Sequence, residues 1–180
     1  MALKSTIFKA ELEVSDLDRS HFAKHSLTLA RHPSETDERM MVRVLAFALN
    51  ADERLAFGRG LSSEDEADLA RTDLTGAIEL WVDVGLPDER AVRKASGRSR
   101  QVTVYAFGTG AEIWWRQNAE PLGRIANLSV VYLPPDATRA MAKGAERSMA
   151  LQCTIQEGRV WLSFGGDPLD ITPVTWKAAA

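Results

Sequence analysis

The chain has 180 residues with a formal net charge of −3, and 45% of its residues are hydrophobic and 26% charged. These values predict one soluble domain with a sizeable core, or one domain with an extra lobe, and not two independent domains. They exclude a global basic field that would attract nucleic acid or an anionic membrane, so any such binding needs a local patch. The lone Cys153 excludes an intramolecular disulfide and a cysteine-based zinc site. With no secretory signal pattern and no apolar run of about 18 residues, we expect a cytoplasmic protein with no membrane segment and no disulfide-linked partner.

The N-terminal region predicts a β-hairpin. Residues 4–14 alternate between apolar and polar side chains as a half-buried strand does, and residues 25–31 are expected to pair back on them. His21 and His25 have the spacing of metal ligands on one face of a helix. No glutamate follows His21 as a zincin helix would require, so exposed polar side chains are the alternative.

A helix is predicted from Ser34 to about Asn50. Ser34 is the expected N-cap, and Asp37 follows three residues later as a shorter version of a capping box. The apolar face of this helix consists of Met41, Val44, Leu45, Ala48 and Leu49. The same face, extended back by one turn, reaches Glu38. The Glu38 carboxylate is therefore either a candidate ligand beside the core or only a complement to the helix dipole.

The strand predicted at residues 77–85 carries two carboxylates where burial is expected. Its alternation places Ile78, Leu80, Val82 and Val84 on one face, and Glu79 and Asp83 on the face that also holds Trp81. Two such acids need a partner, a metal or a substrate, unless this is an edge strand with a wet face. Two short strands precede it, at residues 53–59 and 68–71, and the acidic stretch between them, residues 62–68, is a solvated turn unless a cation neutralises it.

A basic helix is predicted after Pro87. The proline pre-sets a helix start, and Asp88 and Glu89 place negative charge at the positive end of the helix dipole. Five cations follow within eleven residues: Arg90, Arg93, Lys94, Arg98 and Arg100. In an acidic protein they indicate either a local phosphate-binding patch or a solvated helix whose cations offset its C-terminal dipole.

The remaining sequence predicts a parallel crossover and then a β-rich tail. A strand at residues 101–107 and an apolar strand at residues 128–133 are joined by a connection long enough for a helix, expected from Ala111 to about Gln117. Trp114 and Trp115 on that helix are core residues or a base-stacking platform. The tail is expected to contain a helix and three strands, at residues 137–147, 148–156, 159–163 and 169–172.

This order of elements resembles the PD-(D/E)xK nuclease superfamily, in which an αβββαβ core presents an Asp and an Asp/Glu-x-Lys motif on neighbouring strands. Val82-Asp83-Val84-Gly85 is similar to the second motif, with Gly85 in the place of the lysine, and Ala67-Asp68 stands where Pro-Asp would be. The resemblance implies an α/β restriction endonuclease-like fold, with a mixed central sheet flanked by helices and added N- and C-terminal β-hairpins. Residues 1–180 would form a single domain, with its core at about 34–133 and extensions at 1–33 and 134–180.

The chain also resembles the YaeQ family of small bacterial proteins over essentially its full length. The resemblance is carried by Arg31-His32-Pro33-Ser34-Glu35-Thr36, Glu38-Arg39-Met40-Met41, Ala51-Asp52-Glu53-Arg54-Leu55, Glu79-Leu80-Trp81, Gly85-Leu86-Pro87-Asp88-Glu89-Arg90, Ile113-Trp114-Trp115 and Thr154-Ile155-Gln156. It implies a variant of the PD-(D/E)xK fold in which a nuclease activity is suspected.

Phosphodiester hydrolysis needs a hard divalent cation, and carboxylates on adjacent strands suit Mg²⁺, with Mn²⁺ as a substitute. The expected ligands are Asp68 and Asp83, with Glu38 in the outer shell or on a second ion. Lys94 is the candidate replacement for the lysine missing at Gly85.

The expected contacts to backbone phosphates come from Arg59, Arg90 and Arg93. These residues predict a Mg²⁺-dependent nuclease. The alternative is a non-catalytic nucleic-acid- or protein-binding module that retains the nuclease fold. Glu66 and Glu79 have no assigned role, and the sequence does not identify a particular protein partner.

Overall fold

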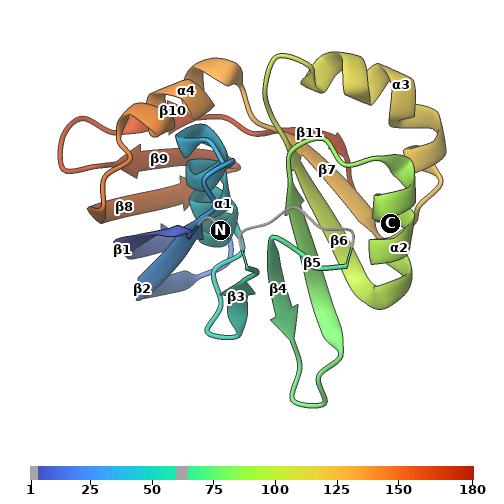
Figure 1. The fold of residues 1–180 in the computed structure, drawn as a ribbon, viewed down its shortest axis with the longest axis horizontal. Helices are drawn as coiled ribbons and strands as arrows, with labels where there is room; N and C mark the ends of the chain where they lie inside the picture. Colours follow the sequence, from blue (N-terminus) through green and yellow to red (C-terminus); the bar gives the residue numbers. More distant parts are fainter. Residues whose placement is uncertain (1–3, 60–64) are drawn as a thin grey trace. The chain divides into compact units, whose positions relative to one another are not determined.

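A computed structural model describes residues 4–59 and 65–180 of the chain. They divide into two compact units: unit 1 comprises Met1–Ala51 and Asp136–Pro173, and unit 2 comprises Asp52–Pro135 and Val174–Ala180. The elements occur in the order β1 (Thr6–Asp16), β2 (His21–Arg31), α1 (Asp37–Leu49), β3 (Leu55–Phe57), β4 (Leu69–Thr72), β5 (Ile78–Val84), α2 (Glu89–Arg98), β6 (Ser99–Ala106), α3 (Ala111–Gly123), β7 (Leu128–Tyr132), α4 (Pro135–Lys143), β8 (Ser148–Gln156), β9 (Arg159–Ser163), β10 (Leu169–Ile171) and β11 (Val174–Lys177) (Figure 1). From α1 to β7 this is the predicted order.

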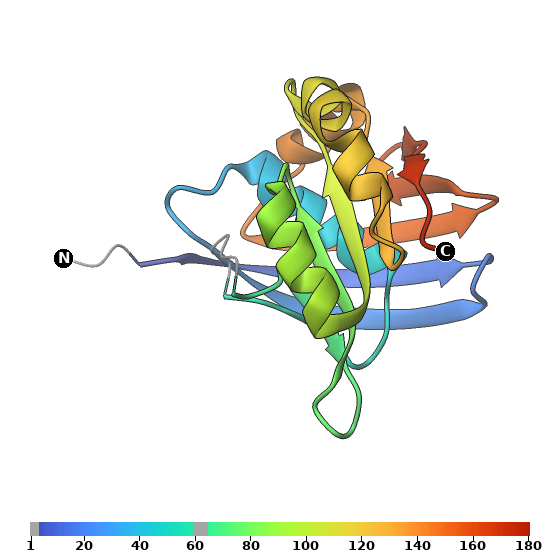
Figure 2. The same cartoon turned by 90° about the vertical axis from the view of Figure 1, so that its right-hand side faces the viewer.

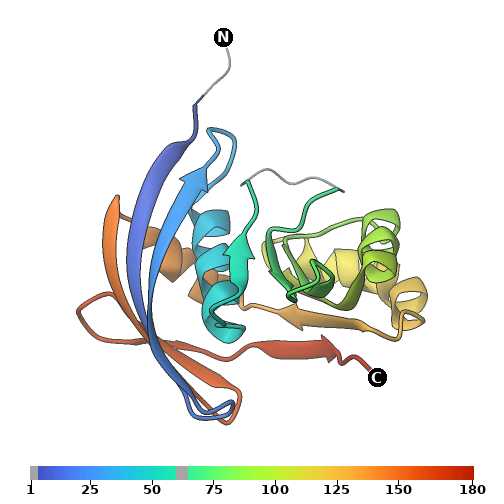
Figure 3. The same cartoon turned by 90° about the horizontal axis from the view of Figure 1, so that it is seen from below.

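Unit 1 is built on a five-stranded mixed sheet with the order β10-β9-β8-β1-β2. β1 and β2 form the predicted antiparallel hairpin, and β8 pairs with β1 in parallel although more than a hundred residues separate them in the chain. One face of the sheet is apolar because alternate residues of β1 and β8 are buried. α1 lies against this face, inside the curve of β1 and β2 (Figure 3). The mixed sheet was not predicted, because a parallel pairing over such a distance leaves no local signal.

The start of α1 differs from the prediction. Thr36 is the N-cap, since its hydroxyl accepts the backbone N–H of Arg39 at 3.1 Å. Ser34, the predicted N-cap, instead lies outside the helix, and its hydroxyl is 2.6 Å from Nδ1 of His32. At the other end, Arg19 donates to the carbonyl oxygens of Ala48 and Ala51, which supplies the positive charge that the last turn of α1 lacks.

The single cysteine lies in the core of unit 1, and this predicts an unreactive thiol. Burial raises the pKa of Cys153 to about 12, and the Asp16 carboxylate adds to the rise. At about pH 8 the folded protein should therefore react with Ellman's reagent at least roughly 100-fold more slowly than urea-unfolded protein. Because only the unfolded thiol ionises near its ordinary pKa, the contribution of Cys153 to stability should fall as the pH rises above about 8.5. Equal rates for folded and unfolded protein would contradict this expectation.

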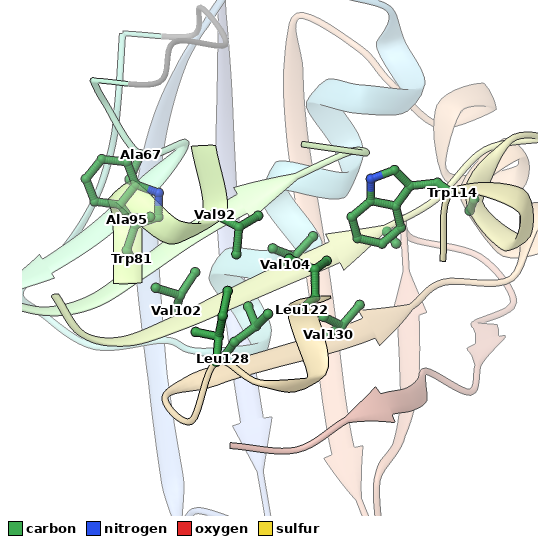
Figure 4. Packing of buried hydrophobic residues seen from close by; sticks show 13 residues of the cluster. Ala67, Trp81, Val92, Ala95, Val102, Val104, Trp114, Leu122, Leu128 and Val130 are labelled. Carbon is green, nitrogen blue, oxygen red and sulfur yellow. The ribbon is translucent and has the colours of Figure 1, made fainter. Parts of the chain in front are cut away.

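Unit 2 is built on a six-stranded mixed sheet with the order β11-β7-β6-β5-β4-β3. β3, β4 and β5 form an antiparallel meander, and β5, β6 and β7 are parallel, as the crossover prediction requires. α2 lies across β5 and β6 (Figure 2). Side chains from α2 and α3 pack on the same face of the sheet, in a cluster that includes Trp81, Val92, Val104, Trp114 and Leu122 (Figure 4). β5 is therefore a central strand, and the edge-strand alternative is wrong.

The C-terminal strand β11 was not predicted. It pairs antiparallel with β7, with Val174 opposite Tyr132. The pairing places Trp176 against Tyr132, with ring centroids 4.4 Å apart, and against Trp115 on its other side at 5.7 Å. Through this stack, Trp176 supplies apolar contacts that hold the short strand β11. Within the described residues, no helix is long and apolar enough to cross a membrane.

Candidate functional site

The structure brings two of the predicted site residues, Asp68 and Asp83, to the same end of the β4–β5 pair. Leu69 is the residue opposite Val82, so Asp68 and Asp83 are the next residues outward on the two antiparallel strands. Asp68 is only 6% exposed, and its Oδ2 accepts the backbone N–H of Val84 at 2.8 Å. Asp83 is half-buried. Because it lies two residues from Trp81, it belongs to the face of the sheet that α2 and α3 cover.

The backbone explains why the position of the expected lysine is a glycine. Gly85 follows the last residue of β5 and has a φ of +111°, a backbone conformation that residues with a side chain rarely adopt. Its N–H donates to the carbonyl oxygen of Tyr105 at 2.9 Å, which holds this conformation. A lysine at this position would be strained, so the chain needs a different cation if it needs one at all.

Lys94, the candidate substitute, lies on the helix that covers this face of the sheet. Its Nζ donates to Oδ1 of Asp65 at 2.5 Å, and Nη2 of Arg98 is 3.6 Å from the same oxygen. The hydrogen bond from Lys94 and its charge lower the pKa of Asp65, and Arg98 adds to the effect. In this structure, Lys94 is thus part of an ion-pair cluster with the acidic segment that leads into β4.

The pairing of Asp65 with Lys94 and Arg98 was not predicted, although the sequence contains a signal for it. Residues 62–68 carry an excess of acids and residues 90–100 an excess of cations, and the two excesses were noted separately. Charge complementarity between them was the available signal. The described part of the acidic segment begins at Asp65, so the prediction for residues 62–64 lies outside the described residues.

The three predicted phosphate contacts lie on the surface of unit 2. Arg59 is 87% exposed, and its Nε is 3.9 Å from Glu66, whose Oε1 also accepts the Arg59 backbone N–H. Arg93 pairs with Glu89 at 2.7 Å across one turn of α2. Together with Arg90 it lines a depression of about 540 Å³ whose other lining residues are Asp88, Glu89 and Asn118. Glu66, which had no predicted role, thus neutralises Arg59.

The two remaining acids have structural partners. Glu38 belongs to unit 1, where its Oε2 accepts the hydroxyl of the fully buried Thr138 of α4 at 3.1 Å. Its role as a ligand stays a prediction. Glu79 accepts hydrogen bonds from Arg54 at 3.2 Å and from Arg71 at 2.9 Å, and these two guanidinium groups lower its pKa. This pairing explains why an acid occurs at position 79 without invoking a ligand.

Two carboxylates suit a hard cation, since Mg²⁺ is usually held by one or two carboxylates with water completing its coordination. Within residues 4–59 and 65–180, no three His, Cys, Asp or Glu side chains gather into a larger metal-binding group. His21 and His25 do meet, with their Nε2 atoms 3.0 Å apart, but they lie on β2. The helical metal-site interpretation of their spacing does not apply on a strand, and the separation of the two rings is that of a hydrogen bond.

The tryptophans of α3 serve packing. Trp114 is buried in the cluster of unit 2, and its Nε1 donates to the carbonyl oxygen of Pro87 at 2.8 Å. Trp115 is stacked against Trp176. Both rings already have partners within unit 2, so these observations favour the core interpretation over a base-stacking platform.

The fold and site define a mixed α/β protein built on two mixed sheets, with adjacent aspartates in the six-stranded one. The chain belongs to the YaeQ family, because the YaeQ protein family profile matches residues 1–173. It is 49% identical to YaeQ of Salmonella typhi and 48% identical to YaeQ of Escherichia coli (strain K12), over 179 residues and 98% of both chains in each case.

Solved structures of the same family have the same fold. The crystal structure of the YaeQ protein from Xanthomonas axonopodis pv. citri matches with a TM-score of 0.93 at 50% identity, covering 97% of this chain and 99% of that one. The YaeQ protein from Pseudomonas syringae matches with a TM-score of 0.92 at 33% identity, covering 97% of each chain. The predicted family resemblance is therefore confirmed.

Proposed function

We propose that this protein is a cytoplasmic, Mg²⁺-dependent phosphodiesterase that cleaves nucleic acid and has a restriction endonuclease-like core. The observation that carries the proposal is that Asp68 and Asp83 lie at the same end of the β4–β5 pair. The element order α1-β3-β4-β5-α2-β6 is that of the αβββαβ core, in which carboxylates on neighbouring strands form the site.

Asp68 and Asp83 are the groups that would hold the metal ion. When bound, Mg²⁺ would polarise the phosphate and favour ionisation of a water molecule. The N–H of Val84 holds the Asp68 carboxylate in a fixed orientation, so this ligand is preorganised. Lys94 offsets negative charge that develops on the phosphate. It would take the role of the motif lysine, whose position is occupied by Gly85 in this chain. Arg59, Arg90 and Arg93 contact neighbouring backbone phosphates.

A second candidate function is nucleic-acid binding without cleavage. Two observations favour it. Lys94 is already paired with Asp65, and the positive φ of Gly85 disfavours a catalytic lysine at that position. A chain of this kind would keep the basic surface of α2 and lack catalysis. Protein binding by the same surface would be a variant of this candidate.

The two candidates differ in whether purified protein cleaves nucleic acid. We expect cleavage of DNA or RNA with Mg²⁺ or Mn²⁺, and none with EDTA. Asp83→Asn should reduce the cleavage rate by roughly 100-fold or more, because it removes the negative charge of a direct ligand and so weakens its hold on the cation. Asp170→Asn is the matched control, since Asp170 is an exposed acid of unit 1 paired with Arg159. Cleavage that ignores EDTA or survives in Asp83→Asn would contradict the proposal, and binding without cleavage in every condition would support the second candidate.

A further inference from the structure

Two cations of α2 already hold an oxyanion in this structure. Lys94 and Arg98 are one helical turn apart, and both approach Oδ1 of Asp65, at 2.5 Å and 3.6 Å. Cations that converge on one oxygen in this way also bind an oxygen of a phosphate group. The Asp65 carboxylate therefore occupies a place that suits a phosphate.

We propose that Lys94 and Arg98 form a binding site for a backbone phosphate of nucleic acid, and that Asp65 occupies this site until the substrate displaces it. This inference rests on the proposed function, which it deepens. It adds Arg98 as a substrate contact, and it assigns Asp65 an autoinhibitory role.

The exposure of the cluster allows such an exchange. The side chain of Asp65 is 73% exposed, and those of Lys94 and Arg98 are 35% and 42% exposed. Exposed ion pairs contribute little to stability because water screens them. A phosphodiester can therefore replace the carboxylate at these two exposed ion pairs, and both cations keep an anionic partner after the exchange.

The next acid in the chain has a similar contact. Glu66 pairs with Arg59, another residue proposed to contact a backbone phosphate. Asp65 and Glu66 thus neutralise cations of the proposed substrate surface from one short segment. Asp68 follows three residues after Asp65. The two acids that phosphates would displace, Asp65 and Glu66, therefore belong to the same short segment as Asp68, the proposed metal ligand.

The test is nucleic-acid binding by Asp65→Asn, measured by fluorescence anisotropy with a short labelled single-stranded DNA in EDTA, where cleavage is suppressed. We expect Asp65→Asn to bind roughly two- to fivefold more tightly than the wild type, because the phosphate no longer competes with a carboxylate. Lys94→Gln and Arg98→Gln should each weaken binding and reduce the slope of log Kd against log salt by about 0.7. Asp170→Asn should change neither quantity.

The double variant Asp65→Asn, Lys94→Gln distinguishes a local contact from a general charge effect. If Asp65 acts through Lys94, the gain from Asp65→Asn should shrink by half or more in the Lys94→Gln background. A gain of the same size in both backgrounds, or an equal gain from Asp170→Asn, would overturn the inference. Efficient displacement of the DNA by inorganic phosphate at a matched phosphate concentration would also overturn it, because the site would then belong to a small free ligand.

The outcomes separate this inference from the proposed function. If the wild type cleaves nucleic acid but Asp65→Asn binds no more tightly, the phosphate site is wrong and the proposed enzyme stands. If no variant cleaves but Asp65→Asn binds more tightly through Lys94 and Arg98, the catalytic proposal is wrong and the phosphate site stands. Absence of binding by every folded variant, with folding checked by circular dichroism, would overturn the inference.

Discussion

Glu35→Gln should lower the free energy of unfolding by about 3–5 kcal/mol, because it leaves a buried cation without its counter-charge. Arg43 is fully buried in α1, and its Nε and Nη2 donate to the two carboxylate oxygens of Glu35 at 2.8 Å each. Arg39 donates to the same carboxylate at 3.0 Å. The loss is a large fraction of the stability of an ordinary domain, so some of the variant should be unfolded at physiological temperature.

The measurement is urea denaturation followed by far-ultraviolet circular dichroism, and Glu120→Gln is its matched control. Glu120 pairs with Arg124 at 2.9 Å, but the two side chains are 83% and 71% exposed, so this substitution should cost less than about 1 kcal/mol. Similar losses in both variants would show that burial of the Glu35 pair carries no special weight. A fully stable Glu35→Gln protein would contradict the expected role of this carboxylate.

Gly58→Ala should also destabilise the protein strongly, by about 3 kcal/mol, the upper end for an added methyl group in a packed site. A Cβ at this position would lie 2.2 Å from the carbonyl oxygen of Ala67. A backbone oxygen cannot rotate away as a side chain does, so the two chain segments would have to separate. Their separation would strain the bond from the Gly58 N–H to the Asp68 carbonyl, which is 2.9 Å long.

Gly97→Ala is the control for this substitution, because it has the opposite expected sign. Gly97 lies in α2. Apart from its chain neighbours and the nearby backbone of the helix, no atom lies within 4 Å of an added Cβ. Alanine is the better helix former, so Gly97→Ala should leave stability unchanged or raise it by up to about 1 kcal/mol. The measurement is the urea denaturation midpoint of each variant. A Gly58→Ala midpoint at or above that of the wild type would mean that the segments around Gly58 and Ala67 can move apart at no cost in stability.

Local patterns identified the elements of this fold well, and the reason is that hydrophobic periodicity is a local property. The alternation at residues 77–85 predicted β5 and its two faces, and the stripe after residue 37 predicted α1. Helix capping was harder because Ser34 and Thr36 are both good N-caps, and the contacts around His32 decide between them. The family was also recognisable from the sequence, and the profile match confirms it.

Long-range pairing was beyond the local signal. β8 joins β1 and β11 joins β7, and each of these pairs depends on how distant segments fold back on one another. Charged side chains show the same limit. In the sequence, Glu35 is notable only within a stretch that carries the family resemblance, yet Glu35 balances Arg43 eight residues further along the chain.

By itself the sequence determined the order of helices and strands from α1 to β7, the face of β5 that carries Asp83, and the surplus of cations on α2, because these depend on residue type and spacing alone. Only the tertiary structure decided that Asp68 lies beside Asp83, that Gly85 has a conformation suited to glycine, and that Lys94 and Arg98 converge on Asp65. The physical reason is that the energy of a hydrogen bond or an ion pair decreases over a few ångströms. The partners are therefore set by distances in the folded protein and not by positions along the chain.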